Sequence, residues 1–224
     1  PLLDAISKLS EEDQRVIFLF SNNFIDSLKD ELIQASRKNP AIIEPLLNII
    51  ERLPEDRQAA ILSAKDDNGW NALMHAAFYQ STAVIPLLNV IQKLPKKCQT
   101  AILLEINYFG GNALMNAVFT HSAAVMPLLD VIAGLPKEDQ ETILLQKSHL
   151  GESVLRLVLC HESKVVEPLL NIIKNFPEEG RGAILSAKNS RGENALMYAV
   201  RYRPAAIEPL LRAVSSLSEE NQAT

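Results

Sequence analysis

Residues 84–91 read Val-Ile-Pro-Leu-Leu-Asn-Val-Ile, and the tripeptide Pro-Leu-Leu within them occurs six times in the 224-residue chain. The six copies start at Pro1, Pro45, Pro86, Pro127, Pro168 and Pro209. The first interval is 44 residues and the next four are 41 residues each. A fixed period of roughly 20 to 50 residues is typical of repeat proteins, in which each unit buries its apolar face against its neighbours. The tripeptide therefore predicts a single repeat domain over residues 1–224, with units at about 1–44, 45–85, 86–126, 127–167 and 168–208 and a partial unit at 209–224.

Each unit contains three stretches with helical character. In residues 84–91 the apolar positions recur at steps of three and four, and the proline implies that this helix begins near it or is kinked there. A second stretch opens with a proline suited to a first helical turn; these prolines are Pro54, Pro95, Pro136 and Pro177. A third begins two residues after a glycine with Asn-Ala-Leu-Met, at residues 71–74, 112–115 and 194–197, or Ser-Val-Leu-Arg at 153–156. We therefore expect an all-α fold, an α-solenoid of stacked repeats with about three helices per 41-residue unit and the motif methionines between units.

The third stretch resembles the core of the ankyrin repeat. Residues 69–77 read Gly-Trp-Asn-Ala-Leu-Met-His-Ala-Ala, against Gly-x-Thr-Pro-Leu-His-x-Ala-Ala in ankyrin repeats, and the similarity continues without gaps to residues 84–88. Asn-Ala and Met replace the signature Thr-Pro and His, and the period is 41 residues instead of about 33. By its period the chain also suits an armadillo-like array, but we favour a divergent ankyrin-type array.

The ankyrin resemblance has implications for the location of a binding surface. In ankyrin arrays, the loop before the first helix and the exposed face of that helix line the concave side. Long, degenerate arrays of this style resemble those in effectors of intracellular bacteria.

The composition is that of a folded, soluble protein, with 47% hydrophobic and 22% charged residues. No apolar run approaches the roughly 18 residues needed to span a bilayer, and no signal-peptide pattern is present. We therefore expect a cytoplasmic protein without membrane insertion, located in the host-cell cytoplasm if it is a secreted effector. Because the chain lacks an initiator methionine and begins and ends inside repeat units, we expect it to be part of a longer protein. We also expect a monomer.

The net charge of −5 argues against nucleic acid as a partner, because nucleic-acid binding depends on neutralising phosphates. The charge is uneven, however, since residues 174–212 contain seven lysines and arginines against four glutamates. This end of the chain could attract an acidic partner, or it could be an ordinary solvated helix face. The two cysteines, Cys98 and Cys160, occupy different positions in their units, so we interpret both as reduced thiols.

Residue types that carry catalysis or bind metals are scattered along the chain. The four histidines, His75, His121, His149 and His161, occupy four different positions in the unit, and no cysteine or glutamate lies at ligand spacing around them. Cys160 and His161 are adjacent, which on a helix directs them about 100° apart and disfavours a Cys–His pair. We therefore expect no enzymatic activity, metal or cofactor within this chain.

Positions that vary between units are the candidates for recognition, because positions that repeat serve packing. The most variable positions are the residues flanking the glycine and the outward positions of the helix that follows. Aromatic and arginine side chains dominate binding energy where an interface buries them. We therefore predict an apolar and a basic partner site. The predicted residues are Trp70, Tyr79, Tyr108 and Phe109 in the first site and Tyr198, Arg201, Tyr202 and Arg203 in the second, and His75 is a further predicted partner-binding residue.

The alternative interpretation is that half of these aromatic residues pack against neighbouring units. Phe78 and Phe119 share one position of the unit and are expected in the core.

We favour a non-catalytic scaffold that binds a partner protein on the concave face. An alternative is a substrate-docking or regulatory arm of a larger enzyme whose catalytic domain lies outside this chain. A third hypothesis, an RNA reader with one base per repeat, requires stacking or hydrogen-bonding residues at one fixed position. The position occupied by His75, Asn116, Leu157 and Tyr198 is too irregular for this role, and the net charge is unfavourable.

Overall fold

The computed structural model describes residues 22–121, 123–161 and 163–218, and within these ranges the chain is all-α. The described residues form fourteen α-helices, three short 3-10 helices and no β-strand. The expected all-α class is therefore confirmed. The first Pro-Leu-Leu at Pro1 and the end of the last unit at 219–224 lie outside the described residues.

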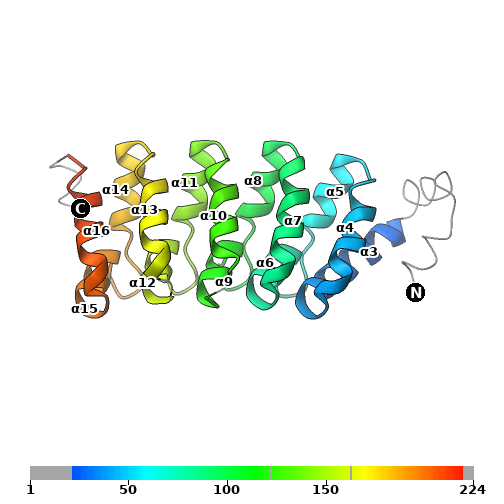
Figure 1. The fold of residues 1–224 in the computed structure, drawn as a ribbon, viewed down its shortest axis with the longest axis horizontal. Helices are drawn as coiled ribbons and strands as arrows, with labels where there is room; N and C mark the ends of the chain where they lie inside the picture. Colours follow the sequence, from blue (N-terminus) through cyan, green and yellow to red (C-terminus); the bar gives the residue numbers. More distant parts are fainter. Residues whose placement is uncertain (1–21, 122, 162, 219–224) are drawn as a thin grey trace.

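Three kinds of helix alternate along the chain (Figure 1). The first helices are α3 (Asn22–Lys38), α6 (Ala72–Tyr79), α9 (Ala113–Phe119), α12 (Val154–His161) and α15 (Ala195–Tyr202). The second helices are α4 (Ile43–Ile50), α7 (Ser81–Lys93), α10 (Val125–Ala133), α13 (Val166–Ile173) and α16 (Ile207–Val214). The third helices are α5 (Glu55–Leu62), α8 (Lys96–Leu104), α11 (Lys137–Leu145) and α14 (Glu178–Ser186). The 3-10 helices η1 (Pro40–Ile42), η2 (Ser163–Val165) and η3 (Pro204–Ala206) precede α4, α13 and α16.

Helices of the same kind lie side by side in chain order, so that the units form an extended row (Figure 1). Along this row, α6 packs on α9, α9 on α12 and α12 on α15. In the same way, α7 contacts α4 and α10, and α8 contacts α5 and α11. Each of these units therefore packs mainly on the units before and after it in the sequence.

A short polar side chain begins four of the first helices. Asn71, Asn112 and Asn194 are the N-caps of α6, α9 and α15, and the Oδ1 of each accepts a hydrogen bond of 2.9 Å from the amide three residues later. Ser153 does the same for α12, where its Oγ accepts from the amide of Arg156. The asparagine of the Asn-Ala-Leu-Met motif is thus the start signal of the first helix.

The prolines lie at helix starts. Each third helix has a proline at its N-cap, a position where the missing amide hydrogen costs no helical bond. The proline of Pro-Leu-Leu is the third residue of α4, α10, α13 and α16, inside the first turn. Only α7, which begins at Ser81, extends further back and contains Pro86 in its interior. The expectation that the second helix begins near this proline is confirmed at the other four positions.

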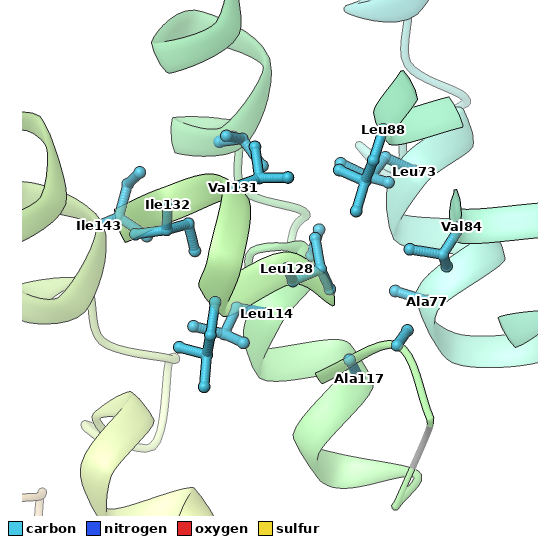
Figure 2. Packing of buried hydrophobic residues seen from close by; sticks show 14 of the residues in the cluster. Leu73, Ala77, Val84, Leu88, Leu114, Ala117, Leu128, Val131, Ile132 and Ile143 are labelled. Carbon is cyan, nitrogen blue, oxygen red and sulfur yellow. The ribbon is translucent and has the colours of Figure 1, made fainter. Parts of the chain in front are cut away.

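The core is a continuous layer of aliphatic side chains between units. Figure 2 shows Leu114 and Ala117 of α9 near Leu128 and Val131 of α10, with Leu73 and Ala77 of α6 on the neighbouring side. All of these side chains are buried. The alanines allow the first helices to approach one another closely. Two of the motif methionines, Met74 and Met115, are buried between units as expected, whereas the third, Met197, is exposed.

A buried glutamine ties the third helix of a unit to the end of the second. The Nε2 of Gln99 donates to the carbonyls of Gln92 and Leu94, at 2.9 and 2.7 Å. Carbonyl groups at a helix C-terminus lack helical partners, so the amide satisfies groups that would otherwise be buried and unpaired. Gln58 and Gln140 make the equivalent pairs of bonds.

Candidate partner-binding surface

The turns that precede α6, α9, α12 and α15 share one closed geometry. In each, a side-chain oxygen accepts hydrogen bonds from the amides two and four residues later, and a glycine three residues later has a φ between +73° and +78°. Left-handed φ values favour glycine because it has no Cβ. The residues that supply the oxygen are Asp66, Asn107, Ser148 and Asn189. These four residues are not among the predicted site residues, although a short polar residue three positions before each glycine was a visible sequence signal.

The tips of neighbouring turns are joined by backbone hydrogen bonds. The amide of Tyr108 donates to the carbonyl of Asn68 at 3.0 Å, and the amide of His149 donates to the carbonyl of Phe109 at 2.8 Å. The amide of Ser190 donates to the carbonyl of Leu150 at 3.2 Å. We call these six residues the tip row. Each tip is held by hydrogen bonds within its own turn and by a backbone hydrogen bond to a neighbouring turn. The backbone that carries the side chains of the tip row is therefore fixed.

Two predicted site residues, Tyr108 and Phe109, are exposed in the tip row. Their exposed fractions are 66% and 65%, and Leu150 of the next turn is also exposed. The ring of Tyr108 lies over Gly69, where a Cβ would come within 2.9 Å of Cδ1. These large apolar side chains are therefore exposed to solvent on a backbone that hydrogen bonds hold in place.

His75 was predicted as a surface residue, and the structure corrects this: its exposed fraction is 4%. Its Nε2 lies 2.9 Å from Oδ2 of Asp66, while Nδ1 has no hydrogen-bond partner. Burial lowers the pKa of His75, against the opposing effect of Asp66. A second proton on Nδ1 would be buried without an acceptor, so the neutral ring donates from Nε2 to the carboxylate.

Asp66 remains ionised beside this ring. Burial by itself raises the pKa of the carboxyl, but hydrogen bonds from the amides of Trp70 and Asn68 and from His75 outweigh it and hold the pKa below the usual 3.8. The pair therefore fixes the turn to the first helix. Asp66 also accepts a hydrogen bond from the amide of Trp70, and its side chain is 23% exposed, whereas that of His75 is buried.

The predicted residues Trp70 and Tyr79 belong to an aromatic cluster on α6. Trp70 is half-buried, with its ring centroid 5.2 Å from that of His75 and 5.3 Å from that of Phe78. The ring of Tyr79 lies 4.8 Å from that of Phe78 and is exposed.

The cluster continues onto the next two first helices. The ring of Phe119 on α9 stacks on that of Phe78 at 6.2 Å, and His161 on α12 follows at 5.1 Å. Phe119 has an exposed fraction of 53% and Phe78 is half-buried, so the expectation that both phenylalanines lie in the core is wrong. Both stand in the last turn of a first helix, on the side away from the buried alanines.

The predicted basic site is divided between two structural roles. The rings of Tyr198 and Tyr202 lie 4.9 Å apart and are tilted by 45°, and the guanidinium of Arg201 lies 5.7 Å from the Tyr202 ring and 3.1 Å from Glu193. These three side chains of α15 therefore lie together. Arg203 instead reaches back to the preceding unit, where it donates to the carbonyls of Leu159 and Cys160 at 2.9 and 2.7 Å.

A buried arginine that the sequence analysis passed over lies beneath the basic site. Arg156 occupies the position of the motif methionine, with its guanidinium 4.4 Å from the centre of the Tyr198 ring. It forms ion pairs with Glu152 on its own helix turn and with Glu193 of the next unit. A glutamate four residues before an arginine was the available sequence signal. This network links α12 to the turn before α15, and Arg201 supplies the second positive charge through its ion pair with Glu193.

No metal-binding group of three or more His, Cys, Asp or Glu residues occurs in the described ranges of the chain. Cys98 and Cys160 are free thiols. Of the helices described, none is both long and apolar enough to cross a membrane.

A scan of the chain against models of protein families found no match, and a search of curated proteins also found none.

Proposed function

We propose that this chain is an α-solenoid of ankyrin-like 41-residue units and serves as a non-catalytic scaffold for a partner protein. The partner would bind the tip row together with the outward faces of the first helices. The observation that carries this proposal is the exposure of Tyr108 and Phe109 on a backbone fixed by hydrogen bonds between turns. Aromatic side chains that become buried supply much of the energy of protein interfaces.

The rigid support of the tip row adds to the argument. Binding is weakened by the entropy lost when loops and side chains become ordered, and a loop that is already ordered loses less. The turns are closed by Asp66, Asn107, Ser148 and Asn189 and are linked to one another. Preorganised apolar side chains of this kind favour recognition over catalysis.

The proposal is tested by partner capture with Tyr108→Ala/Phe109→Ala. The matched control is Ile85→Ala/Met126→Ala, which removes two exposed apolar side chains from the second helices α7 and α10. The immobilised proteins are incubated with cell lysate and washed in moderate salt. We expect the tip variant to lose the proteins retained by the wild type, the control to keep them, and both to unfold near the wild-type temperature.

Equal capture by the tip variant and the wild type would contradict the assignment of this surface. Trp70 is not used in the test because it is half-buried against His75 and Phe78, so that its removal would also change stability.

A further inference from the structure

Four of the five first helices contain no acidic residue, and the exception is α3, which contains Asp26, Asp30 and Glu31. The chain contains 27 acidic and 22 basic residues, yet α6, α9, α12 and α15 contain no aspartate or glutamate. The exposed side chains at the C-terminal ends of the other four include the aromatic Tyr79, Phe119 and Tyr202 and the basic Arg201, and α3 ends in Arg37 and Lys38. We call the outward side chains at the C-terminal ends of these helices the first-helix strip. It comprises Arg37, Phe78, Tyr79, Phe119, His161, Arg201 and Tyr202.

Most of the strip is continuous by direct contact. At one end the guanidinium of Arg37 lies 5.8 Å from the centre of the Tyr79 ring. Tyr79, Phe78, Phe119 and His161 then follow one another with centroid separations of 4.8, 6.2 and 5.1 Å. Four helices, α3, α6, α9 and α12, thus contribute to one surface with an apolar centre.

An arginine lies toward each end of the strip, Arg37 on α3 and Arg201 on α15. Arg37 stands at one side, and at the other His161 lies beside a second imidazole, that of His121, at 5.4 Å. Burial lowers the pKa of His161, His121 and Arg203 lower it further and Glu152 opposes them, so that His161 contributes a neutral aromatic ring to the strip near pH 7. Arg201 lies further along the row, on α15.

Three acids of the turns before the first helices have hydrogen-bond or ion-pair partners. Asp66 accepts hydrogen bonds from turn amides and from His75. Glu152 pairs with Arg156, and Glu193 pairs with Arg156 and Arg201. Because charges more than about 8 Å apart are largely screened at physiological salt, the net charge of −5 does not decide what this strip attracts.

We propose that the first-helix strip binds an acidic segment of a partner protein that also carries aromatic or aliphatic side chains. The apolar side chains of that segment pack on Tyr79, Phe78 and Phe119, and its carboxylates approach Arg37 at one end and Arg201 at the other. This inference rests on the proposed scaffold function and adds the chemistry of the partner. A single-stranded nucleic acid would also stack on these rings, but it presents a phosphate at every nucleotide, and the centre of the strip offers no cation to match.

The probe is a random library of 12-residue peptides displayed on phage and selected on the whole chain, with a 12-nucleotide oligouridylate measured in parallel. We expect the selected peptides to be enriched in both acidic and apolar residues. We also expect their affinity to fall at least about tenfold with Arg37→Glu, which places like charges together. Phe119→Ala should weaken binding as well. The charge-matched control is Lys97→Glu on α8, an exposed site off the strip, which should leave the affinity unchanged.

Several results would overturn the inference. The selection could yield no enriched peptides, or it could enrich basic peptides. The selected peptides could bind Arg37→Glu and Phe119→Ala as tightly as the wild type, or the chain could bind oligouridylate and not peptides. Thermal unfolding of each variant separates lost binding from lost folding. If selection fails while Tyr108→Ala/Phe109→Ala still abolishes lysate capture, the strip inference fails and the scaffold proposal stands.

Discussion

The same positions of the unit are buried inside the row and exposed at α15 and α16. Met115 and Val118 on α9 have exposed fractions of 2% and 0%, whereas Met197 and Val200, 82 residues later at the same positions, have 53% and 62%. Leu129 and Leu211 differ in the same direction. The helices that carry these residues are similar in sequence, but α9 is covered by α12 of the next unit. Burial at these positions is therefore set by the neighbouring unit. Making the same substitution at an inner position and at its equivalent on α15 should measure how much the neighbouring unit contributes to the free energy of unfolding.

The largest contrast is expected between Met115→Ala and Met197→Ala. Truncating a fully buried methionine leaves a cavity and should reduce the free energy of unfolding by about 2–5 kcal/mol. The same truncation on the exposed face should change it by less than about 0.5 kcal/mol. Urea denaturation of both variants and the wild type provides the measurement. Equal losses would show that the neighbouring unit does not determine the contribution of this position.

Glycine substitutions should give the next largest contrast, between Gly151→Ala and Gly192→Ala. Both glycines have left-handed φ, +73° and +78°, so both variants incur strain of about 1–2 kcal/mol. A Cβ on Gly151 would lie 2.7 Å from the amide nitrogen of Ser190, whereas a Cβ on Gly192 would meet nothing within 4 Å. Overpacking should add about 1–3 kcal/mol at Gly151 alone.

The outcome is read from thermal and urea unfolding. An intermediate value for Gly69→Ala would support the interpretation, because its added Cβ meets mainly the side chain of Tyr108, which can move more easily than backbone. A Gly192→Ala variant as unstable as Gly151→Ala would contradict it.

A smaller contrast is expected for the helix caps, between Asn112→Ala and Asn194→Ala. Both lose the hydrogen bond to the amide at the helix start, which is worth about 1 kcal/mol. Asn112 also donates from Nδ2 to the carbonyl of Ile143 and to Oε1 of Gln146 in the next unit. Leaving buried acceptors unpaired should cost about 1–3 kcal/mol more. Identical unfolding midpoints for the two variants would show that the bonds between units contribute nothing measurable.

Features that repeat with the period could be predicted from the sequence, because several copies report the same constraint. The helix starts at the prolines and the buried Met74 and Met115 follow directly from the 41-residue spacing. The structural roles of Gln99 and Asn107 could also have been predicted from the sequence. A polar residue that recurs at the same position of successive units indicates a structural hydrogen bond.

Features that vary between units were harder to predict, because variation has two physical origins. His75 varies from unit to unit, which indicated exposure, yet it is buried because its own turn supplies Asp66 as a partner. Phe78 and Phe119 were assigned to the core by residue type, although Arg201 at the same position was the better guide to exposure. A position that varies between units is therefore either exposed to solvent or buried with a local polar partner. A charged residue at the equivalent position of another unit indicates that the position is exposed.

The smallest expected effect is a pH dependence of stability that comes from His75, which is buried inside the row of units. Because burial lowers the pKa of His75 below 6.5, the unfolded chain binds more protons than the folded chain once the pH falls below 6.5. The stability contributed by the neutral ring is therefore present above pH 6.5 and is lost as the pH falls through the folded pKa. His75→Asn introduces the residue that stands at this position in the next unit, Asn116, and removes the titration. The urea midpoints at pH 7.5 and pH 5.0 should therefore differ less for His75→Asn than for the wild type. Burial also lowers the pKa of His161, so His161→Gln measures how much of the remaining pH dependence comes from that residue. An unchanged difference in His75→Asn would mean that the folded and unfolded chains bind a proton at His75 equally well, and a larger difference would mean that the ring is more readily charged in the fold, as in an ion pair with Asp66.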